Sequence, residues 1–138
     1  MAQTPFRLRV PLRGRDVDTL GHLNHSIYHV LLEEGRTGMI VDALDTPAEE
    51  VAALPFVLVH VSMDYRREVR LTEGAVDVLV WLTHLGITSF RLGYELRRMD
   101  EVVAASGEAV MVGWDPEQRA KRRLTDVERA ALSARLVL

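Results

Sequence analysis

Cysteine is absent from the sequence, so the chain can form neither a disulfide framework nor a thiolate metal site or nucleophile. No apolar run approaches the ~20 residues that a helix needs to span a bilayer. The N-terminal stretch MAQTPFRLRV lacks the apolar segment of a secretory signal peptide. We therefore expect a cytoplasmic protein with no membrane partner.

The chain also lacks the basic excess of a nucleic-acid-binding protein. It has 17 Lys and Arg against 20 Asp and Glu, a formal net charge of −3. No broad basic field would attract a polyanion, and we expect no nucleic-acid partner. The basic residues gather in small groups: Arg66, Arg67 and Arg70; Arg97 and Arg98; and Lys121, Arg122 and Arg123. Such groups are usually solvated, although the forked guanidinium of arginine also suits phosphate contacts.

What is present is the composition of one globular domain. The chain has 138 residues, of which 48% are hydrophobic and 27% charged. This length fits a single domain, residues 1–138, that buries roughly two-thirds of its unfolded surface.

Periodicity in the first part of the chain predicts a strand and then a long helix. The stretch FRLRVPLRG alternates apolar residues with arginine, as a half-buried strand does, and Pro11 indicates a strand end or a sheet edge. From Ile27 the apolar spacing becomes helical. We expect Asn24 or Ser26 as the N-cap and an end near Leu44.

The rest of the chain predicts four consecutive strands. PFVLVHVSMDYRREV has a period of two, which places on one face Val57, Val59, Val61, Met63 and Tyr65. GAVDVLVWLTHLG, SFRLGYELRR and EVVAASGEAVMVGW form three further predicted strands separated by short turns. The stretch TDVERAALSARL predicts a short amphipathic helix with Thr125 as its N-cap. The stretch DTPAEEVAAL predicts another short helix, which begins at Pro47.

This order of elements predicts an α+β fold. Consecutive strands joined by tight turns make an antiparallel sheet, here of five strands, and the one long helix must cover a face of it. The edge strands of such a sheet are unpaired, and pairing through an edge is a common route to dimers. We therefore expect the protein to be an oligomer.

The loop before the long helix concentrates titratable side chains. Asp16 and Asp18 precede Gly21 and the helix. The first turn of a helix has N–H groups without intrahelical partners and carries positive partial charge. A carboxylate beside it places a nucleophile or base next to oxyanion donors, as hydrolysis of an activated acyl group requires. His25, at the first helical position, could exchange a proton near neutral pH.

Each of these residues also has a structural interpretation. An aspartate before a helix is more often a cap or dipole partner than a catalyst. His22, His25 and His29 could ligate a metal, but no paired motif such as H-E-x-x-H is present, so we expect none. Glu33 and Arg36, three apart on the helix, are expected to form a surface or subunit-edge ion pair. Nucleophile elbows, Walker loops and dinucleotide fingerprints are also absent.

The segment DVDTLGHLNHSIY, followed by LLEEGR, closely resembles the signature of the 4-hydroxybenzoyl-CoA thioesterase family of hot-dog-fold acyl-CoA thioesterases. The resemblance continues in HVSMDYRREVRLTEG, LGITSFRLGYELRR and VAASGEAVMVGWDPE, and spans about Phe6 to Leu138. The first motif is specific and the later ones support it. The resemblance implies a hot-dog fold, in which an antiparallel sheet wraps around one long helix.

The resemblance also implies roles for particular residues. Asp18 falls on the catalytic carboxylate, which would attack the thioester carbonyl or activate a water. The backbone N–H of His25 falls at the helix start that polarises the carbonyl oxygen, and in one branch of the family this position is a catalytic histidine. Asn24 and Tyr28 match positions that shape the motif and its pocket.

The family resemblance further implies an assembly and a substrate. Members form homodimers through their sheets, often paired into homotetramers, with the acyl site at the dimer interface. They need no bound cofactor, because CoA is part of the substrate. Some members carry basic residues before the Ser-Phe of the third sheet strand, where this chain has G-I-T. We therefore expect CoA to contact Arg66, Arg67 or the basic residues 121–123.

The hypothesis is a thioesterase that hydrolyses an acyl-CoA, or an acyl-carrier-protein thioester, to free acid and thiol. One alternative is a hot-dog protein that binds acyl-CoA without turnover. Another is a hot-dog enoyl-thioester hydratase.

Overall fold

The computed structural model describes residues 5–47, 49–50 and 54–137. The elements follow the order β1 (Phe6–Pro11), η1 (Gly14–Asp16), α1 (His25–Leu44), β2 (Phe56–Tyr65), η3 (Leu71–Glu73), β3 (Ala75–Leu85), β4 (Ser89–Arg98), β5 (Val103–Asp115), β6 (Ala120–Lys121) and α2 (Asp126–Ser133). The predicted α+β order is confirmed, whereas the short helix predicted to open at Pro47 includes residues 48 and 51–53, which lie outside the described residues. Within these residues, no helix is long and apolar enough to cross a membrane.

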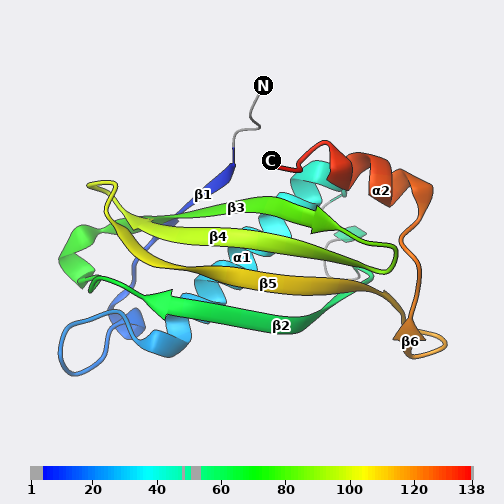
Figure 1. Cartoon of the computed structure of the whole chain (residues 1–138). Coiled ribbons are helices and arrows are strands. Elements are labelled where there is room, and N and C mark those ends of the chain that lie inside the picture. The colour runs from blue at the N-terminus through cyan, green and yellow to red at the C-terminus, as the bar shows by residue number, and fades with distance from the viewer. Residues whose placement is uncertain (1–4, 48, 51–53, 138) are drawn as a thin grey trace.

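The five long strands form one antiparallel sheet in the order β1-β3-β4-β5-β2, and α1 lies across one face of it (Figure 1). Strand β1 pairs with β3, and β2 pairs with β5, so the two strands that flank α1 in sequence lie at opposite ends of this order. The short strand β6 pairs with the end of β5. This sixth strand was not predicted from the sequence.

Helix α1 packs closely on the sheet. Its buried apolar side chains are Tyr28, Leu31, Leu32, Met39 and Ile40. Gly35 allows the close approach, because a Cβ at this position would overlap Val78 and lie 3.1 Å from Cγ2 of Val80. Any larger residue at this position would push α1 away from β3.

Strand β2 does not keep the single period of two that the sequence predicts. Its pairing with β5 shifts between Leu58 and His60, so Val59 is an extra residue in a bulge. The bulge exchanges the two faces of the strand: Phe56 lies in the core before it, and Val61 packs against the core after it. The prediction that Val57 shares a face with Val61 is therefore wrong, and Val59, the extra residue, is half exposed.

The C-terminal segment is held by a capped helix and a partly buried ion pair. Thr125 is the N-cap of α2, as predicted, and exchanges hydrogen bonds with Glu128 in a capping box. Glu128 also accepts from Arg122 at 2.7 and 2.9 Å, and the Arg122 guanidinium lies 5.5 Å from the centroid of the Phe56 ring. Burial alone would raise the pKa of Glu128, but the hydrogen bonds from Arg122 and Thr125 lower it.

Edge strand β1 is fastened to the sheet by a buried carboxylate. The side chain of Asp77, on β3, accepts from Nε of Arg7 at 2.8 Å and Nε of Arg9 at 2.9 Å. Only 1% of its surface is exposed. These hydrogen bonds keep the pKa of Asp77 below its ordinary value, and the hydrogen bond from Arg9 lowers the pKa more than the one from Arg7.

We expect Asp77→Asn to lower the free energy of unfolding by about 1–3 kcal/mol at neutral pH, the range for hydrogen bonds to charged groups. Because the folded-state pKa is depressed, this stabilisation is complete above the unfolded pKa of about 3.9 and is lost as pH falls through the folded value. Urea unfolding across this range measures the difference between the proteins.

The matched control is Asp100→Asn, because Asp100 pairs with Arg98 on the exposed surface, where ion pairs contribute little. A difference between wild type and Asp77→Asn that stays constant into acid would contradict the account of Asp77.

Candidate active site

A compact loop of residues 12–24 leads from β1 to the N-terminus of α1. The Asp18 N–H donates to the carbonyl of His22 at 2.8 Å, and the Gly21 N–H donates to the carbonyl of Asp18 at 3.0 Å. Gly21 has a φ of 77°, in the left-handed region that favours glycine. This turn fixes the backbone of Asp18 beside the start of the helix.

The structure separates the two acids of the loop. Asp16 is buried, and its carboxylate accepts from the N–H of Arg13 at 2.8 Å. Its carbonyl accepts from the N–H of Asn24 at 2.8 Å, so Asp16 ties the loop to the helix start. Asp18 is exposed, and one carboxylate oxygen accepts from two backbone N–H groups of its own turn at 2.9 and 3.3 Å. The other oxygen has no hydrogen-bond partner among the residues that the structure describes.

Helix α1 begins at His25 with Asn24 as its N-cap. The side-chain oxygen of Asn24 accepts from the N–H of Ser26 at 3.0 Å and from its hydroxyl at 2.9 Å. Asn24 therefore orients the first turn, as a cap does. In the described part of the chain, the N–H of His25 makes no hydrogen bond and is available to an acceptor.

Most of the residues expected at the site line one cavity of about 360 Å³. Its lining comes from the loop, the first turn of α1 and the segment at the end of β2: Asp18, His22, Leu23, His25, Tyr28, Tyr65, Arg66, Arg67 and Glu68. Asn24 is absent from this lining. The cavity thus combines a carboxylate, a helix N-terminus and basic side chains.

Two tyrosines connect α1 with the end of β2. The rings of Tyr28 and Tyr65 meet edge to face with their centroids 5.0 Å apart. The hydroxyl of Tyr65 lies 3.4 Å from both the carbonyl oxygen of His25 and Nε2 of His29. Burial raises the pKa of Tyr28, so its hydroxyl stays protonated at neutral pH.

An acid–histidine pair at the same cavity was missed by sequence reasoning. Nε2 of His22 lies 2.6 Å from the carboxylate of Glu68, which also accepts from Arg70 at 2.9 Å. A bridge between the backbones of His22 and Arg70 brings the two segments together. No local pattern links residues so far apart in sequence. Tyr65 was assigned to a strand face but not to the site.

The two groups of basic residues expected to meet CoA differ in their surroundings. Arg66 and Arg67 are exposed at the cavity; Nε of Arg66 donates to the Ser106 hydroxyl at 2.9 Å. Arg122 instead donates to Glu128 and to backbone carbonyls, including that of Pro55 at 3.1 Å. The guanidinium of Arg122 is therefore bound within the protein, and a contact between residues 121–123 and CoA stays a prediction.

The histidines of the loop and helix are not assembled into a metal site. Within the described residues, no group of three or more His, Cys, Asp or Glu side chains could hold a metal ion. His22 pairs with Glu68, and His29 contacts Tyr65. Each of these two histidine side chains therefore already contacts another side chain of the protein.

The expected ion pair between Glu33 and Arg36 does not form. Glu33 is exposed, whereas Arg36 is only 7% exposed, and their charged atoms are not within 4.0 Å. The prediction of a surface pair is wrong because the Arg36 side chain turns inward, beneath α1.

A family model described as the thioesterase-like superfamily matches residues 12–134. The chain therefore belongs to the thioesterase-like superfamily. This confirms the resemblance at the level of the superfamily, while membership of the 4-hydroxybenzoyl-CoA thioesterase family itself stays a prediction. No curated protein matches the sequence.

Solved structures of thioesterases share this fold. A predicted thioesterase from Bacillus stearothermophilus is 24% identical, with a TM-score of 0.86 and 96% of each chain covered. A thioesterase from Thermus thermophilus, complexed with coenzyme A and Zn, is 28% identical, with a TM-score of 0.82, over 97% of this chain and 96% of that chain. A 1,4-dihydroxy-2-naphthoyl-CoA thioesterase from Synechocystis is 16% identical, with a TM-score of 0.79, over 94% and 96%. The predicted hot-dog fold is thereby confirmed.

We expect the two loop acids to differ in what their replacement does to stability. Asp16→Asn should lower the free energy of unfolding by about 1–2 kcal/mol, because it weakens a buried charge-assisted hydrogen bond. Asp18→Asn should change it by less than about 0.5 kcal/mol, because asparagine retains the oxygen that accepts from the turn. Denaturant unfolding of the two variants provides the comparison. An equal loss in both variants would contradict the separation of these roles.

Proposed function

We propose that this protein is a thioesterase that hydrolyses an acyl-CoA, with Asp18 as the nucleophile or general base. One observation carries the proposal: the exposed Asp18 carboxylate and the N-terminus of α1 at His25 line the same cavity. A carboxylate and a set of oxyanion donors are the two parts that acyl hydrolysis needs.

In the proposed reaction, the thioester carbonyl oxygen accepts from the N–H of His25, and the positive end of α1 stabilises the charge that develops on it. Either Asp18 attacks the carbonyl carbon, or it removes a proton from a water that attacks. Both routes break the acyl–sulfur bond and release the CoA thiolate, which then takes up a proton. If Asp18 attacks, water hydrolyses the resulting anhydride, so the products are a free acid and CoA in either case.

The side chain of His25 is proposed to assist proton transfer, since an imidazole nitrogen can donate or accept a proton. Asn24 holds the helix start in place through its cap, and Tyr28 forms a wall of the cavity. No bound cofactor or metal has a role in this proposal, because the thioester is already an activated acyl group. The cytoplasmic location stays a prediction.

The proposed binding groups for the CoA phosphates are Arg66 and Arg67. Both are exposed and line the cavity that holds Asp18, and guanidinium groups bind phosphate oxygens in a forked geometry. The similar thioesterase from Thermus thermophilus was solved with coenzyme A, which favours CoA over a carrier protein as the thiol group.

We expect Asp18→Asn to reduce the rate of thiol release from acyl-CoAs by about 10²–10⁴-fold, because a positioned general acid or base usually contributes a factor of this size to the rate. The assay follows free thiol with a panel of aliphatic and aromatic acyl-CoAs, with Asp100→Asn, an exposed aspartate that does not line the cavity, as the matched control. A chelator added to the wild-type enzyme should leave the rate unchanged.

Full activity in Asp18→Asn would contradict the proposed mechanism. Binding of acyl-CoA without thiol release by wild type would favour a non-catalytic binding protein. Loss of the conjugated absorbance of an enoyl-CoA, without thiol release, would favour a hydratase.

We also propose that the protein forms a homodimer through β2, with a homotetramer as the further assembly. The two edge strands of the main sheet differ in character. Strand β1 carries Arg7 and Arg9, charged residues that discourage pairing, whereas β2 exposes Leu58 and Val59 at 40% and 50%. The exposed apolar edge favours β2 as the interface.

We expect Val59→Lys to convert the oligomer to a 15.6 kDa monomer, because it places a charge in the proposed apolar edge. Light scattering coupled to size-exclusion chromatography measures the mass and also distinguishes dimer from tetramer. The control, Val127→Lys, changes a valine on α2 that is 78% exposed. A wild-type protein that is monomeric, or a variant mass that does not change, would contradict the proposed interface.

A further inference from the structure

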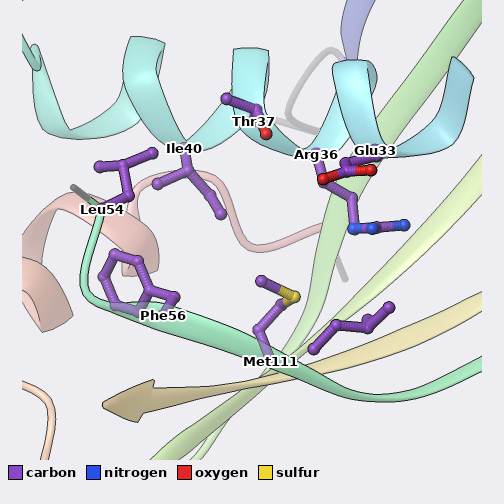
Figure 2. Close-up of a pocket in the computed structure, with 8 residues that line it drawn as sticks. Glu33, Arg36, Thr37, Ile40, Leu54, Phe56 and Met111 are labelled. Atoms are coloured by element: carbon purple, nitrogen blue, oxygen red, sulfur yellow. The ribbon is translucent and has the colours of Figure 1, made fainter. Parts of the chain in front are cut away.

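A second cavity lies further along α1, between the helix and strands β2 and β5. Its volume is about 190 Å³. Its lining combines apolar side chains, among them Ile40, Phe56, Leu58 and Met111, with the polar side chains of Glu33, Arg36 and Thr37. Figure 2 shows Arg36 extending from the helix into the space above the strands, on the same side as Ile40. The cavity therefore places one cation beside apolar side chains, with Glu33 and Thr37 on the helix side of the lining.

Arg36 forms no salt bridge in the described part of the chain. It is 7% exposed, and no carboxylate of these residues lies within 4.0 Å of its guanidinium. Glu33 also lines the cavity, and its charge offsets part of the effect that burial has on the pKa of Arg36, but the Glu33 side chain is exposed to solvent. The neighbouring Tyr94 does not neutralise it, since burial raises the pKa of Tyr94 to about 12 and its hydroxyl donates to the carbonyl of Ser62.

A largely buried guanidinium without a salt bridge is unfavourable, because the charge loses part of its hydration. Burial accordingly lowers the pKa of Arg36, but arginine stays protonated at neutral pH. An anionic ligand would restore the lost interactions, and the forked guanidinium matches the two oxygens of a carboxylate. The apolar walls would suit a hydrocarbon chain attached to that carboxylate.

Arg36 is aligned with the candidate active site. Arg36 and His25 are eleven positions apart in α1, which is close to three full turns, so they lie on the same face about 16 Å apart along the axis. Strand β2 follows this face, with Tyr65 near His25 at one end and Phe56 in the Arg36 cavity at the other. A chain that extends from the carbonyl site along α1 would run toward the guanidinium.

We infer that Arg36 binds an anionic group at the far end of the acyl chain, so that the substrate class is an acyl thioester with a terminal carboxylate. The inference rests on the proposed thioesterase function for its catalytic step. It concerns which acyl group is selected, and not how the thioester is cleaved.

The test uses matched pairs of thioesters that differ only in the terminal group: sebacoyl-CoA against decanoyl-CoA, and dodecanedioyl-CoA against dodecanoyl-CoA. We expect wild type to favour the carboxylate-bearing member of at least one pair by roughly tenfold or more in kcat/KM. Arg36→Met, which replaces the charge with an apolar chain, should abolish that preference mainly through KM. Arg36→Lys should retain part of it, and the exposed control Arg91→Met should leave it intact.

Equal rates for the two members of both pairs, or a preference for the alkyl members, would overturn the inference while leaving the thioesterase in place. An Arg36→Met variant that loses the same factor on both members would also overturn it, because the arginine would then support the fold alone. Calorimetric binding of the same pairs to Asp18→Asn, with and without Arg36→Met, separates the two proposals. Selective binding of the carboxylate-bearing member that depends on Arg36 would support the inference even if wild type showed no turnover.

Discussion

The hydrogen bond from the Asn24 N–H to the Asp16 carbonyl determines where the loop meets the helix, and the site depends on that junction. Asp16 can make this contact because its buried carboxylate is held by the N–H of Arg13. The junction fixes both the turn that carries Asp18 and the first turn of α1. A carboxylate held on a rigid turn beside unpartnered N–H groups needs little reorganisation to stabilise an oxyanion.

Helix α1 links the proposed chemistry to the proposed selectivity. Its N-terminus lies at the cavity of Asp18, and its middle carries Arg36 into the second cavity. The close approach of α1 to β3 at Gly35 keeps the helix against the sheet. The same rigid element would therefore place the carbonyl oxygen and the end of the acyl chain.

Periodicity was sufficient to predict the elements because the apolar faces repeat regularly over long stretches. Strand β4 has the predicted bounds, and Asn24 and Thr125 are the N-caps of α1 and α2. The bulge at Val59 was missed because one inserted valine leaves the local composition of a strand unchanged. Pattern alone left Asp16 and Asp18 equivalent, and only the family resemblance distinguished them. The structural difference lies in tertiary hydrogen bonds that no local spacing encodes.

The inward turn of Arg36 could not be predicted either, because a glutamate and an arginine three positions apart usually form a surface pair. Whether a side chain turns inward depends on the space between α1 and β2, which only the folded chain defines. Glu68 and Tyr65 join the site for the same reason, since the return of β2 toward the helix start brings them beside His22 and His25.

The central claim is that the thioester carbonyl is held between Asp18 and the start of α1. A crystal structure of Asp18→Asn with an intact acyl-CoA tests this most directly. The account predicts the carbonyl oxygen within hydrogen-bond distance of the His25 N–H, the carbonyl carbon beside residue 18, and the CoA phosphates at Arg66 and Arg67. An acyl-CoA bound with its carbonyl away from both Asp18 and the helix start would contradict it.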